Sequence, residues 1–95
     1  MRIRWTPAAA SDLTSIYEYL REHEPHLAQT TVIEIRQAVS FLKTLPNRGR
    51  KGREEGTREL LHQRLPQIIA YRVNTPLWKS CISGIRRRTD EVWER

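Results

Sequence analysis

Residues 67–73 read Gln-Ile-Ile-Ala-Tyr-Arg-Val, the stretch of this chain richest in the β-branched and aromatic residues that favour strands. Leu65-Pro66 precedes it and Asn74-Thr75-Pro76 follows it, and both segments have the composition of turns. Further strands are predicted on either side, over residues 57–64 and over residues 77–85. Three consecutive strands joined by short turns predict an antiparallel meander.

The first half of the chain carries helical periodicity instead. Thr6-Pro7 combines a good N-cap with a residue suited to the first helical turn. Two apolar stripes follow, which predict helices over about residues 7–22 and about residues 25–44. The short break at Glu24-Pro25 makes the pair a helical hairpin over about residues 7–44. The stripe residues are Ala9, Leu13, Ile16, Tyr17 and Leu20, then Ala28, Val32, Ile35, Val39 and Leu42.

A short strand is predicted before the hairpin, because residues 2–5 alternate Arg-Ile-Arg-Trp. The element order is therefore β-α-α-β-β-β, an α+β fold in which the hairpin packs on a mainly antiparallel sheet. We expect one domain over residues 1–95, since a second would leave neither half a core. Residues 46–56 form a loop with three glycines and four basic residues, and residues 86–95 form a tail.

Charge is unevenly distributed along the chain. Lysine and arginine number 17 against 11 acidic residues, and the excess lies wholly after position 46. Such a field indicates an acidic partner, either nucleic acid or an acidic protein segment, or else simply a well-solvated surface.

Two further features of the sequence exclude whole classes of protein. No apolar run approaches the ~18 residues of a membrane span. Cys81 is the only cysteine, so an internal disulfide and a cysteine-rich zinc site are excluded. We therefore expect a cytoplasmic protein that needs no cofactor and no metal.

Several segments, in their order along the chain, resemble the ParE/RelE superfamily of bacterial toxins from type II toxin–antitoxin pairs. The glycine- and arginine-rich middle section is more similar to the ParE branch than to the RelE branch. The segments are Trp5-Thr6-Pro7-Ala8-Ala9-Ala10-Ser11-Asp12-Leu13, Ile16-Tyr17-x-Tyr19-Leu20, Leu45-Pro46-Asn47-x-Gly49-Arg50-x-Gly52-Arg53, Gly56-Thr57-Arg58-Glu59-Leu60 and Tyr71-Arg72-Val73.

The resemblance implies a toxin that inhibits growth by binding a cytosolic target, with DNA gyrase as the target known for the ParE branch. It also implies a cognate antitoxin with an acidic, partly disordered C-terminal segment, through which any contact with DNA would be indirect. The C-terminus departs from the family pattern. Arg87 stands where a histidine is common, whereas Trp93 matches a terminal aromatic residue.

The alternative is a RelE-type, ribosome-dependent mRNA endonuclease. That chemistry needs a proton acceptor and a proton donor, and an arginine is a poor base. No histidine or tyrosine follows Tyr71, so we assign no catalytic residue and favour binding over catalysis. A plain nucleic-acid-binding module is a third reading, but residues 46–58 contain no aromatic residue for base stacking.

Two sets of candidate site residues follow. Guanidinium groups pair well with phosphate and carboxylate, although they can equally form salt bridges to Glu59, Asp90 and Glu91. Ile33 and Phe41 lie off the main apolar stripe, so each either widens the core or stays exposed for the antitoxin, and Tyr19 lies on the flank of its helix, where the antitoxin can cover it. The target-binding candidates are Arg58, Arg72, Arg86, Arg87, Arg88 and Trp93, of which Arg58 can be structural and Trp93 can anchor the tail.

Overall fold

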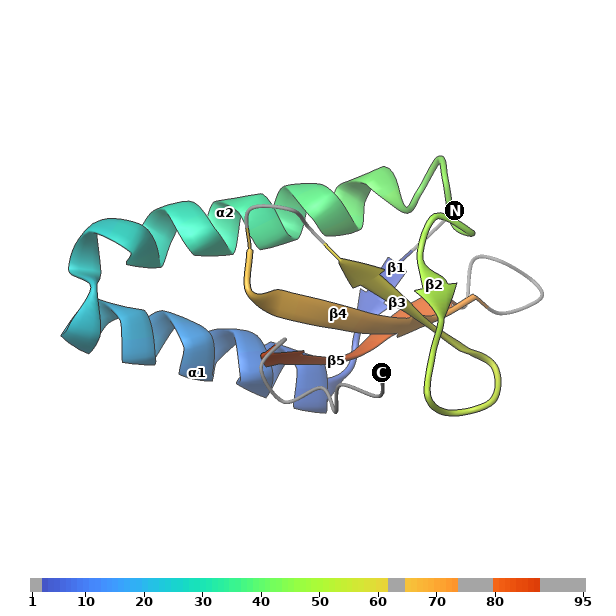
Figure 1. The fold of residues 1–95 in the computed structure, drawn as a ribbon, viewed down its shortest axis with the longest axis horizontal. Helices are drawn as coiled ribbons and strands as arrows, with labels where there is room; N and C mark the ends of the chain where they lie inside the picture. The colour runs from blue at the N-terminus through green and yellow to red at the C-terminus, as the bar shows by residue number, and fades with distance from the viewer. Residues whose placement is uncertain (1–2, 62–64, 74–79, 88–95) are drawn as a thin grey trace, which may run out of the picture.

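Figure 1 shows the computed structural model of the chain, which describes residues 3–61, 65–73 and 80–87. Two helices form a hairpin and pack against a five-stranded sheet. The α+β class and the helical hairpin are confirmed. The elements are β1 (Ile3–Trp5), α1 (Pro7–His23), α2 (Pro25–Phe41), β2 (Arg50–Lys51), β3 (Thr57–Leu61), β4 (Gln67–Arg72) and β5 (Ser80–Arg87).

The sheet has the strand order β1-β5-β4-β3-β2. The four strands after the helices pair antiparallel in sequence order, as a meander does, while β1 pairs parallel with β5. The helical hairpin between β1 and the later strands supplies the long crossover that a parallel pair requires. The first and last strands of the described chain are therefore neighbours.

Thr6 fixes the start of α1. Its backbone lies in the extended region, and its side-chain oxygen accepts a hydrogen bond from the backbone N–H of Ala9 at 3.1 Å. The hydroxyl of Thr6 also donates to the carbonyl of Ser83 in β5, at 3.4 Å. The residue that caps the helix thus also ties the helix to the sheet.

A β-bulge lies in β5 beside α1. Ala70 pairs with Gly84, and the next residue, Tyr71, pairs with Ile82, so Ser83 is an extra residue in the ladder. Asp12 reaches this region from α1, and its Oδ2 accepts a hydrogen bond from the backbone N–H of Ile85 at 2.9 Å.

The core lies between the hairpin and one face of the sheet. The helices contribute small and branched side chains, and the strands contribute alternate residues. Ala28, Ile35, Val39 and Leu42 of the predicted seam are buried, whereas Val32 is half-buried. The main cluster contains Ala9, Ile35, Ala38, Val39, Leu42, Leu60, Leu65, Ile69, Tyr71, Ile82 and Ile85.

Three predicted boundaries are wrong. The second helix ends at Phe41 rather than at residue 44, because the backbone N–H groups of Leu42, Lys43 and Thr44 bond to carbonyls three residues back instead of four. The predicted loop over 46–56 contains β2, whose Arg50 pairs with Glu59. The predicted tail from residue 86 is also incorrect at its start. Arg86 and Arg87 belong to β5, because their backbone pairs with Ile68 and Gln67 without needing apolar side chains.

No helix among the described residues is long and apolar enough to cross a lipid bilayer.

Candidate functional site

Four residues form a row across β2, β3, β4 and β5. Arg50 pairs with Glu59, Glu59 with Ala70, and Ala70 with Gly84. Their chain neighbours Leu60, Ile69 and Ile85 enter the core, so the row lies on the face of the sheet away from the helices. Arg72 and Arg86 stand two positions from the row on β4 and β5, and we call this surface the arginine face (Arg50, Glu59, Ala70, Arg72, Arg86).

Glu59 is the buried acidic centre of the arginine face. Its side chain is only 5% exposed, and Arg50 and Arg86 hold one carboxylate oxygen each. The distances are 2.9 Å from Arg50 Nη2 to Oε1 and 2.8 Å from Arg86 Nη2 to Oε2. Burial acts to raise the pKa of Glu59, but the hydrogen bonds and charges of the two arginines outweigh it and hold the pKa below its usual 4.5. The carboxylate is therefore a weak base.

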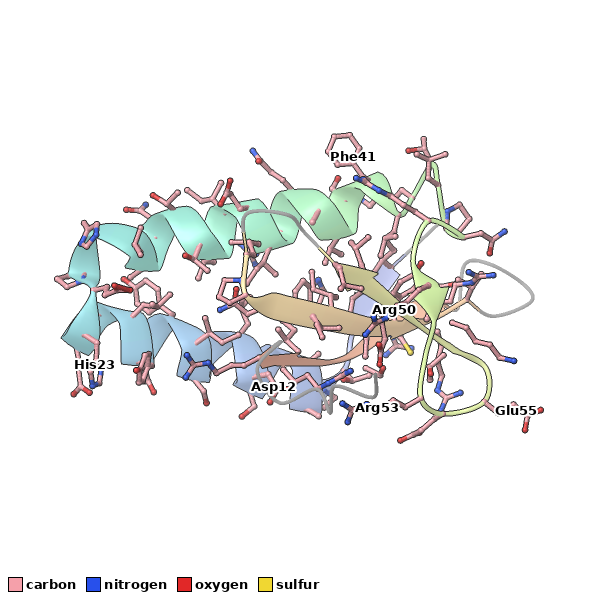
Figure 2. All side chains as sticks on the ribbon, in the orientation of Figure 1. Asp12, His23, Phe41, Arg50, Arg53 and Glu55 are labelled. Carbon is pink, nitrogen blue, oxygen red and sulfur yellow. The ribbon has the colours of Figure 1, made fainter. Side chains whose placement is uncertain are left out.

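A hollow of about 400 Å³ adjoins Glu59 on the arginine face. Ala70 and Gly84 leave space in its floor because neither carries a bulky side chain. Three arginines and two glutamates line it, together with two hydroxyl-bearing residues. The lining residues are Arg53, Glu54, Thr57, Glu59, Ala70, Arg72, Ser83, Gly84 and Arg86. Figure 2 labels Arg50 on β2 and Arg53 in the loop that follows β2.

The described residues among the predicted target-binding set lie on opposite sides of the sheet. Arg72 and Arg86 share the hollow, but Arg58 and Arg87 alternate onto the other side of their strands. Arg58 Nη1 donates to the carbonyl of Gly49 at 2.7 Å, which supports the structural reading of this residue. Arg87 lies over the ring of Tyr19, 5.7 Å from its centroid. Arg88 and Trp93 lie outside the described residues.

Arg50 on the arginine face and Arg53 in the lining of the hollow were not predicted from the sequence, and Glu59 was predicted only as a salt-bridge partner. The alternative interpretation of the C-terminal arginines, a salt bridge to Glu59, is observed at Arg86. One available signal was the strand alternation around Leu60, which puts Glu59 opposite the apolar face. Nothing in the composition of residues 46–56 pointed to a pairing strand.

The predicted antitoxin-binding residues lie on two separate surfaces. Tyr19, 49% exposed, lines a groove of about 680 Å³ between α1 and the β4–β5 end of the sheet, together with Leu20, His23, Gln67 and Arg87. The rings of Tyr19 and His23 stack, with centroids 4.1 Å apart.

The second surface is on α2. Ile33 and Phe41 are eight residues apart, about two helical turns, and are 47% and 57% exposed. Both therefore lie on the exposed side of α2 instead of widening the core, and Figure 2 shows Phe41 projecting away from the sheet. Arg48 lies 5.9 Å from the Phe41 ring centroid.

Within residues 3–61, 65–73 and 80–87, no group of three or more His, Cys, Asp or Glu residues could hold a metal ion.

Comparisons with known proteins agree with this architecture. Residues 3–88 match the model of the ParE toxin of the type II toxin–antitoxin system parDE. The chain is 41% identical over 73 residues to "Putative toxin Y4kP" of Sinorhizobium fredii, which covers 77% of this chain and 76% of that protein.

The fold of the chain is also similar to that of a solved structure. One chain of the "Chromosomal ParDE TA system from P. aeruginosa" superposes with a TM-score of 0.81 at 30% identity, covering 92% of this chain and 95% of its own. The match to the family model spans most of the sequence, and the fold and the ordered motifs agree with it. This chain therefore belongs to the ParE family of toxins from type II toxin–antitoxin systems, a family whose members are paired with an antitoxin.

Proposed function

We propose that this ParE-family toxin arrests growth by binding a protein target in the cytoplasm through its arginine face. DNA gyrase is the candidate target at the level of the family. A cognate antitoxin neutralises the toxin by covering Tyr19, Ile33 and Phe41. In this assignment Arg72 and Arg86 contact the target, while Arg58 and Arg87 contribute less because they lie on the other side of their strands.

The observation that carries the proposal is that the Glu59 carboxylate is a weak base whose oxygens are both bonded to arginines. A nuclease of the RelE type needs a group that takes a proton from a ribose hydroxyl. Glu59 has a lowered pKa and both oxygens bonded to arginines, so it is poorly suited to that role. The described arginine face offers fixed positive charge and hydrogen-bond donors, which favour binding over proton transfer.

Tyr71 does not supply the missing proton shuttle. Burial raises its pKa above 10.0, against the opposing effects of the Gly49 N–H and the charges of Arg58 and Arg48. Its hydroxyl bonds to Pro46 and Gly49 in the loop before β2, and its ring belongs to the core cluster on the helix side of the sheet.

The test is to induce the chain alone and to measure growth, DNA breakage and cleavage of ribosome-bound mRNA in the same cells. We expect growth arrest with DNA breakage and no mRNA cleavage. Arg86→Gln should relieve the arrest, whereas Arg87→Gln makes the same charge change one residue away on the opposite side of β5 and should retain it. Co-expression of the neighbouring antitoxin gene should restore growth.

The RelE-type alternative predicts other results. His62, which lies outside the described residues, would be the nearest histidine in the sequence to the β3 and β4 strands. Loss of toxicity in a folded His62→Ala protein, together with cleavage of ribosome-bound mRNA by the unmutated protein, would replace the gyrase-type assignment with a nuclease.

A further inference from the structure

The hollow on the arginine face exists because of two small residues in register. Ala70 and Gly84 are directly opposite each other on β4 and β5, and Glu59 continues the same row on β3. Arg72 stands two positions along β4 from Ala70, and Arg86 stands two positions along β5 from Gly84. A space without bulky side chains therefore opens between two guanidinium groups.

Among the described residues, the charged groups in and beside the hollow leave one positive charge unbalanced. Four arginines (Arg50, Arg53, Arg72 and Arg86) stand against Glu54, Glu59 and Asp12, whose Oδ2 lies 3.4 Å from where a Cβ on Gly84 would be. Glu59 is already bonded to Arg50 and Arg86, and Glu54 lies 3.4 Å from Arg72. Arg53 is exposed and forms no ion pair with any residue in the described part of the chain.

Arg86 holds hydrogen-bonding capacity that Glu59 does not use. Its Nη2 bonds to Glu59, but its Nε is buried and has no partner in the described structure. A buried donor without an acceptor is unfavourable. A guanidinium that already meets one carboxylate through a single nitrogen can pair a second oxyanion through its remaining N–H groups.

We propose that the hollow binds the carboxylate of an acidic side chain presented by a protein partner. This rests on the proposed function, in that the partner is either the toxin's target or its antitoxin. The carboxylate lies over Ala70 and Gly84 and pairs with Arg86, Arg53 and Arg72.

Two observations favour a single protein carboxylate over a nucleic-acid backbone. One unbalanced charge suits one carboxylate, whereas a run of phosphodiesters is held by several uncompensated cations along a groove. Among the residues that the structure describes, no aromatic side chain lines the hollow, so this lining offers bases no stacking partner.

The test uses the purified chain and two fluorescent probes, a peptide of six glutamates and a single-stranded RNA of six nucleotides. Binding is followed by fluorescence anisotropy and by the NMR signal of the Arg86 Nε–H group. We expect the peptide to bind more tightly than the RNA and to shift the Arg86 signal. Arg53→Gln and Arg86→Gln should each weaken peptide binding about tenfold, the effect of losing a charge-assisted hydrogen bond.

Ala70→Leu separates the shape of the hollow from its charge. It fills the floor and leaves every arginine in place, so it should also weaken peptide binding about tenfold. Arg36→Gln removes one charge from α2, away from the hollow, and should change binding less than twofold. If Arg86→Gln fails to fold because Glu59 loses a partner, Arg53→Gln and Ala70→Leu still decide the question.

The proposal is overturned if the RNA binds more tightly and shifts the Arg86 signal, if Ala70→Leu binds normally, or if Arg36→Gln weakens binding as much as Arg53→Gln. Purified gyrase and the antitoxin are then added separately to the complex of chain and peptide. The protein that displaces the peptide is the natural source of the carboxylate, and displacement by neither contradicts the proposal. Peptide binding does not depend on growth arrest, so failure of this site and failure of the proposed function are observed independently.

Discussion

The backbone N–H of Gly49 donates a hydrogen bond to the hydroxyl of Tyr71 at 2.9 Å, across 22 positions of sequence. The same hydroxyl donates to the carbonyl of Pro46 at 2.8 Å. Arg58 adds a bond from Nη1 to the Gly49 carbonyl. The loop that leads into β2 is thus fastened to β3 and β4 by residues that the resemblance to ParE toxins had singled out separately.

Tyr71→Phe should lower the free energy of unfolding by about 1–3 kcal/mol, because Gly49 N–H and Pro46 C=O both lose a partner at a site that is largely buried. Urea denaturation followed by circular dichroism measures this. Tyr19→Phe is the matched control, since the Tyr19 side chain is half-exposed, and should change stability by less than about 0.5 kcal/mol. Equal effects in the two variants would show that the Tyr71 hydroxyl does not stabilise the loop.

Gly49→Ala should also be destabilising, for a steric reason. A Cβ at this position would lie 2.7 Å from the Tyr71 hydroxyl and 2.8 Å from the backbone oxygen of Glu59. We expect a loss of about 1–3 kcal/mol in the free energy of unfolding. Combining Gly49→Ala with Tyr71→Phe should cost less than the sum of the single changes, because the two residues interact directly. Strict additivity in this double-mutant cycle would contradict the contact.

The ion pairs of Glu59 should make stability depend on acidic pH. The pKa of Glu59 is lower in the folded chain than its usual 4.5. The stabilisation is therefore fully present above pH 4.5 and is lost as the pH falls through the lower, folded-state pKa. The unfolding free energies of the wild type and Glu59→Gln should differ more at pH 7 than at pH 3. Glu18→Gln, an exposed change on α1, should show no such convergence.

Two isoleucines on α2 test the orientation of the helix. Ile35 is fully buried, whereas Ile33 is 47% exposed. Ile35→Asp should abolish folding, because a buried carboxylate without a partner is strongly unfavourable. Ile33→Asp should yield a cooperatively melting protein. A folded Ile35→Asp protein would show that the core does not depend on this face of α2.

Ile33 and Phe41 should also matter for the antitoxin. Ile33→Asp with Phe41→Asp replaces the two most exposed large apolar side chains of α2 and should weaken antitoxin binding at least tenfold with the fold retained. Arg36→Gln is the control on the same helix. Surface plasmon resonance against the purified antitoxin measures both. Unchanged affinity in the double variant would move the antitoxin interface away from α2.

The helical hairpin was predictable because its information is local. Apolar side chains recur at helical spacing, and Pro7 and Pro25 each stand at the first position of a helix. The α+β fold class and the antiparallel meander were predictable from the same kind of local sequence pattern. Arg86 and Arg87 were not recognisable as strand residues, because their place in β5 depends on pairing with β4 and not on apolar side chains.

The faces of β5 could not be predicted for a different reason. Ile82 and Ile85 are three residues apart, yet both belong to the core cluster. Strict alternation would put them on opposite faces, and only the extra residue at Ser83 lets both face the helices. The arginine face therefore depends on a β-bulge at Ser83 that no sequence pattern predicts.

The parallel pairing of β1 with β5 has a consequence for how the chain is made. β5 lies between β1 and β4, so without it the first strand has no partner and the sheet is cut in two. Because β5 is the last described strand to be synthesised, β1 must wait for it, and the pairing of β1 with β5 closes a loop of more than seventy residues. A growing or truncated chain that lacks residues 80–87 cannot assemble the arginine face. The arginine face therefore forms only after residues 80–87 have been synthesised.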